Sequence, residues 1–285
     1  MKFTTLTILL LLAATALSGA RYEPAARPNI LWILAEDMGP ELGFLGTPEV
    51  QTPHLDGLAA RGMVFTHAFT TSPVCSPSRS AFNTGMYQTT IGAHNHRSHR
   101  AEDPSPYPFP LPEGVHVISD WLRHAGYFTG NIRHFPESID FQGTGKTDWN
   151  FTYDGKPFDT DRWADLKNRQ PFYAQVNFPE THRGRAWNEA HTHIPRPADP
   201  DAVVLPPYYP DHPVVRDDWA QYLNTVMLLD RKIGAVLDRW IEETDDQGRF
   251  PEDQRVIEYY EQRMKDNYDE RIDALRRQWG LTDGQ

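Results

Sequence analysis

The chain has only one cysteine, Cys75, among its 285 residues, so no disulfide can form within it. Basic residues are also few: the chain has 28 Lys and Arg and 39 Asp and Glu, which gives a net charge of −11. Binding to nucleic acid in general needs a basic surface that neutralises phosphates, so this balance excludes nucleic acid as an expected partner. An acidic protein can still hold an anion in a local basic pocket.

Long hydrophobic runs are missing after the first 20 residues. The segment 1–20 combines a basic Lys2, an apolar stretch and small residues at Ser18 and Ala20. This is the pattern of a secretory signal peptide, and it is too short for a membrane-spanning helix. We therefore predict a signal peptide at 1–20, a periplasmic or secreted product and no membrane span.

The lone cysteine lies in the stretch 72–79, directly before a predicted helix. Ser76 suits the N-cap of that helix, Pro77 its first position and Gly85 its end. The free N–H groups at a helix N-terminus favour bound anions, so we expect Cys75 to face an anionic substrate. The alternative is that Cys75 is a small buried thiol without a chemical role.

Apolar runs at 29–35 and 172–178 are typical of buried parallel strands. The first run is followed by Glu36 and Asp37, and the second is followed closely by His182. Ligands bind at the carboxyl ends of strands in open α/β sheets, so we expect a site where these residues meet. A solvated acidic loop is the alternative interpretation of the Glu36–Asp37 pair.

The rest of the chain alternates between strand and helix patterns. Residues 63–69 and 127–132 are predicted to be strands, and helices are predicted from 53 and over 117–125. From about Val215, apolar residues recur at helical spacing, which predicts a long helix whose inner face is core. This order predicts an α/β fold built from right-handed βαβ units.

The segment 94–100 concentrates three histidines and two arginines in an otherwise acidic chain. His94, His96 and Arg97 can line a pocket for anionic groups, because arginine forms charge-assisted hydrogen bonds with them. A plain surface loop and a transition-metal site are the alternatives, since imidazole is a common metal ligand. No neighbouring cysteine or second histidine cluster in the sequence completes a metal site.

The stretch 143–148 is similar to a fragment of a phosphate-binding loop. It lacks the Walker spacing, and no clear strand leads into it, so we do not predict nucleotide binding.

The residues Cys75 to Arg79 read Cys-Ser-Pro-Ser-Arg and are followed by Thr84-Gly85. This resembles the sulfatase signature Cys-x-Pro-x-Arg, and the chain is most similar to heparan N-sulfatase-like (N-sulfoglucosamine sulfohydrolase-like) bacterial members. The resemblance implies an α/β, alkaline-phosphatase-like sandwich with a mostly parallel central sheet. It also implies hydrolysis of a sulfate ester or N-sulfate on a sulfated carbohydrate such as the glycosaminoglycan heparan sulfate.

The resemblance further implies a covalent modification and a metal. In that family a formylglycine-generating or anaerobic sulfatase-maturating enzyme converts the cysteine to formylglycine, whose hydrate attacks sulfur. Calcium would be bound by Glu36, Asp37 and residue 75, although the family usually has Asp where this chain has Glu36. By the same resemblance, the catalytic residues are Cys75, Arg79 and Lys146 at the sulfate and His182 at the leaving oxygen.

The resemblance leaves out one internal part of the family's sequence. Residues 27–237 are similar to the N-terminal part of a sulfatase catalytic domain, and 238–285 to a helical C-terminal tail. The second pair of metal ligands, a later lysine and the smaller C-terminal sheet domain are missing between them, so the expected fold is truncated. A non-catalytic sulfated-glycan binding protein and a phosphoryl or phosphonate hydrolase of the same superfamily remain alternatives.

Overall fold

The structure, a computed structural model, describes residues 27–96 and 109–245. The predicted signal peptide, Arg97 and the tail beyond 245 therefore lie outside the described residues. The central feature is a four-stranded sheet of order β1-β4-β2-β3, in which every neighbouring pair is parallel. The strands are β1 (Ile30–Ala35), β2 (Phe128–His134), β3 (Thr160–Arg162) and β4 (Phe172–Phe178). This confirms the predicted α/β class with a parallel central sheet.

Strand β4 lies inside the sheet, and all seven of its residues are buried. Successive side chains of a strand point to opposite faces. One face of β4 carries the apolar Phe172, Ala174, Val176 and Phe178, whereas the other carries Tyr173, Gln175 and Asn177. The sheet therefore has one apolar face and one face with polar groups that must find hydrogen-bond partners.

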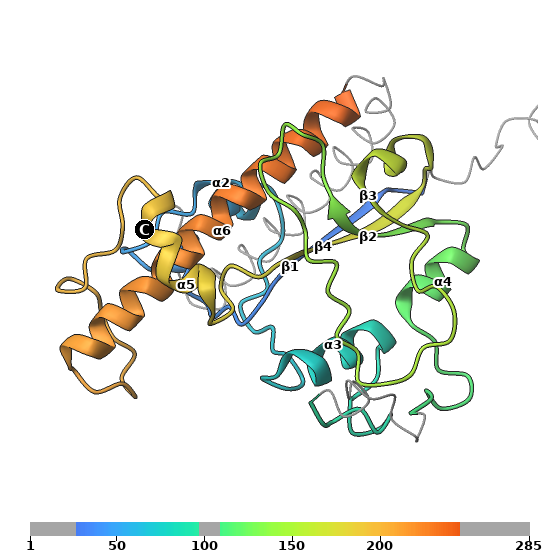
Figure 1. Cartoon of the computed structure of the whole chain (residues 1–285), viewed down its shortest axis with the longest axis horizontal. Helices are drawn as coiled ribbons and strands as arrows, with labels where there is room; N and C mark the ends of the chain where they lie inside the picture. The colour runs from blue at the N-terminus through green and yellow to red at the C-terminus, as the bar shows by residue number, and fades with distance from the viewer. Residues whose placement is uncertain (1–26, 97–108, 246–285) are drawn as a thin grey trace, which may run out of the picture. The chain divides into compact units, whose positions relative to one another are not determined.

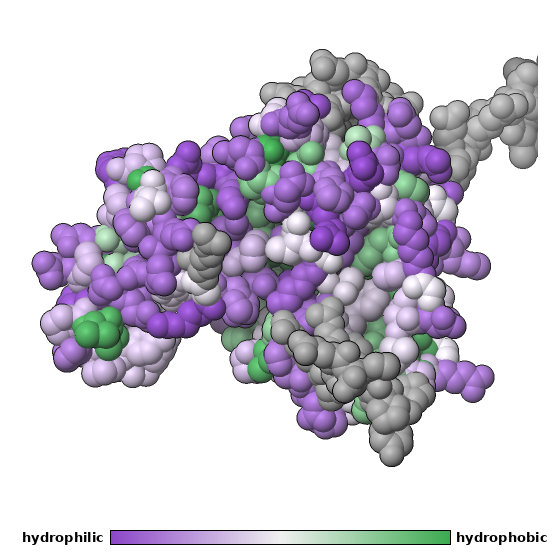
Figure 2. Space-filling view, viewed as in Figure 1, coloured by the Kyte–Doolittle hydropathy of each residue, from purple (hydrophilic) through white to green (hydrophobic). Residues whose placement is uncertain are grey.

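Helix α6 (Pro213–Asp245) covers the apolar face with Leu229, Ile233 and Val236. It is the long amphipathic helix that the sequence predicts, and it continues without a break past residue 237. The structure has no helix in its described ranges with the length and apolar character to cross a membrane. Figure 2 shows mainly hydrophilic residues on the visible face, as the charged composition leads one to expect.

Helix α3 (Cys75–Thr84) lies on the opposite side of the strands from α6 (Figure 1). It begins earlier than predicted, because the carbonyl of Val74 accepts the first helical bond, from the Ser78 N–H at 3.0 Å. The prediction of Ser76 as N-cap is therefore wrong, and its buried hydroxyl has no partner among the described residues. The helix ends as predicted at Gly85, whose φ of 67° suits glycine.

The predicted strand at 63–69 is wrong, because these residues form an irregular loop. Met63, Phe65 and Phe69 are 63%, 73% and 85% exposed. Strand preference depends on a paired neighbour, and β1 is at the edge of the described sheet with β4 as its one partner. The remaining helices are α2 (Pro53–Arg61), α4 (Ile118–His124) and α5 (Arg185–Glu189), with short 3-10 helices η1 (Gly43–Leu45), η2 (Trp163–Asn168) and η3 (Ala190–His193).

Helix α2 is attached to α6 by one buried carboxylate. Asp230 accepts hydrogen bonds from the backbone N–H groups of Leu55 at 2.8 Å and His54 at 3.3 Å. These are N-terminal amides of α2 that have no partner within their own helix. Burial raises the pKa of Asp230, and the two amide hydrogen bonds oppose this rise.

We expect Asp230→Ala to lower the free energy of unfolding by about 1–3 kcal/mol, because two partly buried amides lose their acceptor. Urea denaturation of the purified protein measures this change. Asp217→Ala, an exposed change on the same helix, is the control and should stay within about 0.5 kcal/mol of the parent. Equal losses in the two variants would show that Asp230 does not hold α2.

Candidate active site

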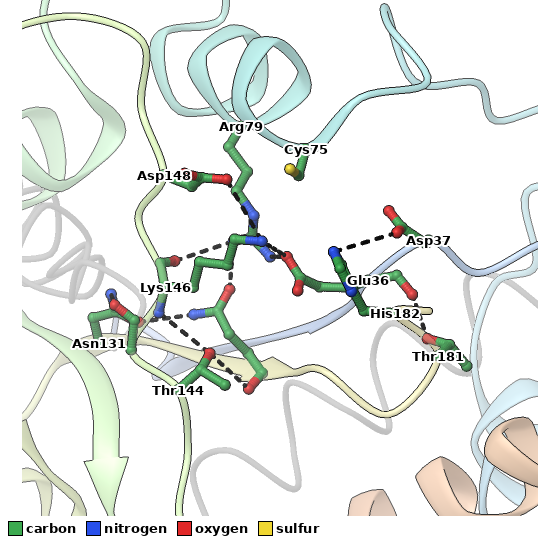
Figure 3. A network of polar contacts seen from close by, with 12 residues as sticks. Glu36, Asp37, Cys75, Arg79, Asn131, Thr144, Lys146, Asp148, Thr181 and His182 are labelled. Carbon is green, nitrogen blue, oxygen red and sulfur yellow. Dashed lines mark hydrogen bonds and ion pairs between the residues drawn. The ribbon is translucent and has the colours of Figure 1, made fainter. Parts of the chain in front are cut away.

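The ends of β1 and β4 fix Glu36 in a buried position, 6% exposed. Its backbone N–H donates to the carbonyl of Phe178 at 3.1 Å and so extends the pairing of the two strands. The hydroxyl of Thr181 donates to the carbonyl of Glu36 (Figure 3). The carboxylate thus projects from the carboxyl edge of the sheet, where the sequence places a ligand site.

Arg79 reaches this carboxylate from α3 and is itself only 5% exposed. Its Nη2 is 3.1 Å from Glu36 Oε1, and its Nη1 donates to Asn177 Oδ1 at 2.6 Å and to the Lys146 carbonyl at 3.1 Å. The Asn177 amide donates in turn to Asn131 Oδ1 at 2.8 Å. The guanidinium is therefore held in one orientation by the residue that follows β1, by a side chain of β4 and by a carbonyl of the loop 143–148 (Figure 3).

Lys146 brings a second cation to Glu36. Its Nζ is 2.6 Å from Glu36 Oε1 and 3.5 Å from Asp148 Oδ2, and Asp148 is fully buried. The loop packs closely on β2, because a Cβ at Gly143 would lie 2.2 Å from the Ile132 carbonyl oxygen. The glycine at this position thus permits close packing of the loop on β2.

Cys75, the first residue of α3, lies beside these charged groups (Figure 3). Its Sγ is 3.3 Å from His96 Nε2. Burial raises the pKa of the Cys75 thiol and a hydrogen bond with Asp148 raises it further, whereas the charge of Lys146 acts in the opposite direction. A raised pKa keeps the thiol protonated at neutral pH, so the environment does not favour a thiolate nucleophile.

Asp37 and His182 form a second, more open part of the site. The His182 Nε2 is 3.8 Å from Asp37 Oδ2, and the two side chains are 43% and 47% exposed. Asp37 has a φ of 47°, a left-handed conformation that is uncommon for residues other than glycine. The backbone turns sharply there and presents the carboxylate to His182 (Figure 3).

The predicted calcium ligands do not form a complete shell. Calcium takes about six to eight oxygens, whereas Glu36 Oε1 already contacts two cations and Asp37 faces His182. In the described ranges, one group of three His, Cys, Asp or Glu residues has its ligand atoms within 4.8 Å of one another, and it contains Cys75, His96 and Asp148. The predicted ligands in the described ranges therefore offer fewer oxygens than calcium takes.

The structure brings most of the predicted site residues together. Three of them, namely Glu36, Arg79 and Lys146, form one network of ion pairs, with Cys75, Asp37 and His182 beside it. His96 contacts Cys75, whereas His94 is exposed. The sequence analysis missed Asp148, Asn177, Asn131 and Thr181. Asn177 could have been found, because it is a polar residue inside an apolar strand and so needs a hydrogen-bond partner.

Comparisons with known proteins identify the family of the sequence. The Sulfatase family model matches residues 28–247. The Ulvan-active sulfatase of Formosa agariphila is 30% identical over 278 residues, which cover 81% of this chain and 45% of the relative. Human N-sulphoglucosamine sulphohydrolase is 30% identical over 245 residues, covering 74% and 47% respectively. The chain thus spans less than half the length of these curated relatives.

A solved structure supports the fold. The crystal structure of yidJ, a proposed sulfatase from Bacteroides fragilis, superposes with a TM-score of 0.51 at 22% identity, covering 81% of this chain and 61% of that one. The sheet and its flanking helices are therefore of the alkaline-phosphatase-like type. Because the family model matches most of the sequence and the signature cysteine lies at the end of this sheet, the chain belongs to the sulfatase family.

Proposed function

We propose that the protein hydrolyses a sulfate ester or N-sulfate on a sulfated carbohydrate after Cys75 has been converted to formylglycine. One observation carries this proposal: the signature cysteine begins α3 next to the two cations that converge on Glu36. A sulfate group placed at residue 75 would meet Lys146, Arg79 and the N-terminal amides of the helix. Donors fixed before the reaction stabilise the charge that develops in the transition state.

Formylglycine at position 75 would supply a hydrated aldehyde whose hydroxyl attacks sulfur. Around it the chain provides the groups that orient and move protons. Asp148 has its carboxylate within 4.8 Å of the Cys75 sulfur and would accept a proton from a hydroxyl at position 75. His182 can donate a proton from Nε2 to the leaving oxygen or nitrogen, and the Asp37 carboxylate near that atom stabilises the charged ring.

Charge balance explains why a cation would assist the reaction. The positive charges of Arg79 and Lys146 are matched by the negative charges of Glu36 and Asp148, at distances of 3.5 Å or less. Such a neutral set attracts a sulfate only weakly, unless a cation takes over one carboxylate and frees Lys146 for the substrate. We propose calcium for this role, bound weakly because its shell is incomplete.

The substrate class rests on the relatives. Their names refer to ulvan and to N-sulphoglucosamine, which are sulfated carbohydrates. We propose a sulfated glycan of the glycosaminoglycan type, with export to the periplasm or outside the cell. The required partner is a formylglycine-generating or anaerobic sulfatase-maturating enzyme, which would recognise Cys75, Pro77 and Arg79.

The first prediction from this proposal concerns the modification of Cys75. Produced together with a maturation enzyme, the chain should carry formylglycine at position 75, because the signature is complete and Cys75 is only partly buried. Peptide mass spectrometry of the tryptic fragment measures the conversion. An entirely unmodified thiol, in a host that matures another sulfatase in parallel, would contradict the proposal.

The second prediction concerns turnover. Cys75→Ala should abolish sulfate release, and Lys146→Met should lower kcat/KM by about 10²-fold or more, because a fixed cation is lost. Lys156→Met is the matched control, since Lys156 is exposed in the same segment of the chain, and it should leave the rate unchanged. The assay uses an aryl sulfate and a glucosamine N-sulfate, with an aryl phosphate as the competing substrate. Faster release of phosphate than of sulfate would favour the phosphoryl hydrolase instead.

The third prediction concerns calcium. Isothermal titration of the purified protein should show weak binding, because the described carboxylates offer fewer than the roughly six to eight oxygens that calcium takes. Turnover of the matured chain should accordingly be slow and rise with calcium concentration. Tight stoichiometric binding together with fast turnover would show that residues outside the described ranges complete the shell. Glycan binding that persists in Cys75→Ala, with no sulfate release from the parent protein, would instead indicate a non-catalytic binding protein.

A further inference from the structure

A sulfur, a nitrogen and a carboxylate converge at the N-terminus of α3. Cys75 Sγ and His96 Nε2 are 3.3 Å apart, although the residues are 21 positions apart in the sequence. Asp148 joins them, because the ligand atoms of Cys75, His96 and Asp148 all lie within 4.8 Å of one another. The sequence analysis found no cysteine near the histidine-rich segment, and the fold supplies one.

The spacing of these atoms suits a small tetrahedral ion. Zinc binds sulfur at about 2.3 Å and imidazole nitrogen at about 2.0–2.1 Å, so tetrahedral angles place the two ligand atoms about 3.5 Å apart. The observed 3.3 Å is close to this value before any metal-driven adjustment. Calcium is excluded as the preferred ion, because it selects oxygen ligands at longer distances and in greater number.

Asp148 already lies close to the sulfur and the nitrogen, so its carboxylate needs little movement to reach such an ion. It is fully buried, and Lys146 Nζ is 3.5 Å from its Oδ2 but only 2.6 Å from Glu36 Oε1. The contact between Lys146 and Asp148 is thus the longer of the two, and a metal held by Asp148 would leave the shorter Lys146–Glu36 pair in place. A divalent cation would also offset the cost of a negative charge held away from water.

We propose that the chain with unmodified Cys75 binds one Zn²⁺ through Cys75 Sγ, His96 Nε2 and an Asp148 carboxylate oxygen, with water as the fourth ligand. Zinc displaces the thiol proton, which passes to solvent, and no electron is transferred. Conversion of Cys75 to formylglycine removes the sulfur ligand and with it the site. The immature protein thus binds a soft metal at the position that the mature protein uses for hydrolysis, and zinc should shield the thiol from modification.

The test uses full-length protein made without a maturation enzyme and freed of metal, titrated with Co²⁺ as a spectroscopic probe and then with Zn²⁺. We expect one Co²⁺ per chain, with a thiolate-to-cobalt charge-transfer band and intense tetrahedral visible bands, all displaced by zinc. Cys75→Ser should remove the charge-transfer band. His96→Ala and Asp148→Asn should each weaken zinc binding by more than the roughly 10–100-fold effect typical of groups that only support a ligand.

Two matched changes serve as controls. His191→Ala alters an exposed histidine and Asp154→Asn an exposed aspartate near Asp148 in the chain, so both should bind zinc like the parent. Far-UV circular dichroism checks that each variant is folded. If Asp148→Asn unfolds, the zinc affinity of His96→Ala alone tests the proposal, because His96 is exposed and its loss should not unfold the protein.

The proposal is overturned if the parent protein gives no charge-transfer band, or if Cys75→Ser retains it. It is also overturned if His96→Ala binds zinc as tightly as His191→Ala. Because the experiment uses unmodified protein and measures no turnover, its failure would leave the proposed hydrolysis standing. Failure of sulfate release would likewise leave the zinc site intact.

Discussion

The buried ion pair between Arg79 and Glu36 is the contact on which the site depends. Both side chains are nearly inaccessible to water, so each charge needs the other and the surrounding hydrogen bonds to offset its desolvation. Removal of one partner from such a pair typically costs about 3–5 kcal/mol, because the other charge is left unpaired. The pair therefore ties α3, and with it Cys75, to the end of the strands. A substitution at Arg79 would disturb the fold and the chemistry together.

The polar face of β4 makes this attachment possible. Asn177 accepts from Arg79 and donates to Asn131, so the interior of the sheet provides a partner for a buried cation. On the opposite face, α6 packs against apolar side chains of the same strand. One strand thus separates a hydrophobic core from a polar network, and the site gains its rigidity before any substrate arrives.

The chemistry at residue 75 then decides which ligands this rigid network accepts. A thiol beside His96 and Asp148 makes a mixed sulfur, nitrogen and oxygen set, which suits zinc. In the proposed mature form, an oxygen nucleophile at the same place would leave Lys146 to bind a sulfate and the carboxylates to bind a hard cation. Under the two proposals, the same backbone would hold two different ions, and conversion of Cys75 to formylglycine would switch the preference from one to the other.

Local pattern in the sequence determined the parallel strands at β1, β2 and β4, the helix α6 and the motif around Cys75, because periodicity and capping residues act over a few positions. Tertiary structure decided the rest. Residues 63–69 have strand-like composition yet form a loop, since a strand needs a neighbour to pair with. Asp148 and His96 reach Cys75 through folding of distant segments, and Asn177 meets Arg79 across 98 positions. Contacts between distant segments produce no periodic pattern in the sequence, so only the tertiary structure reveals them.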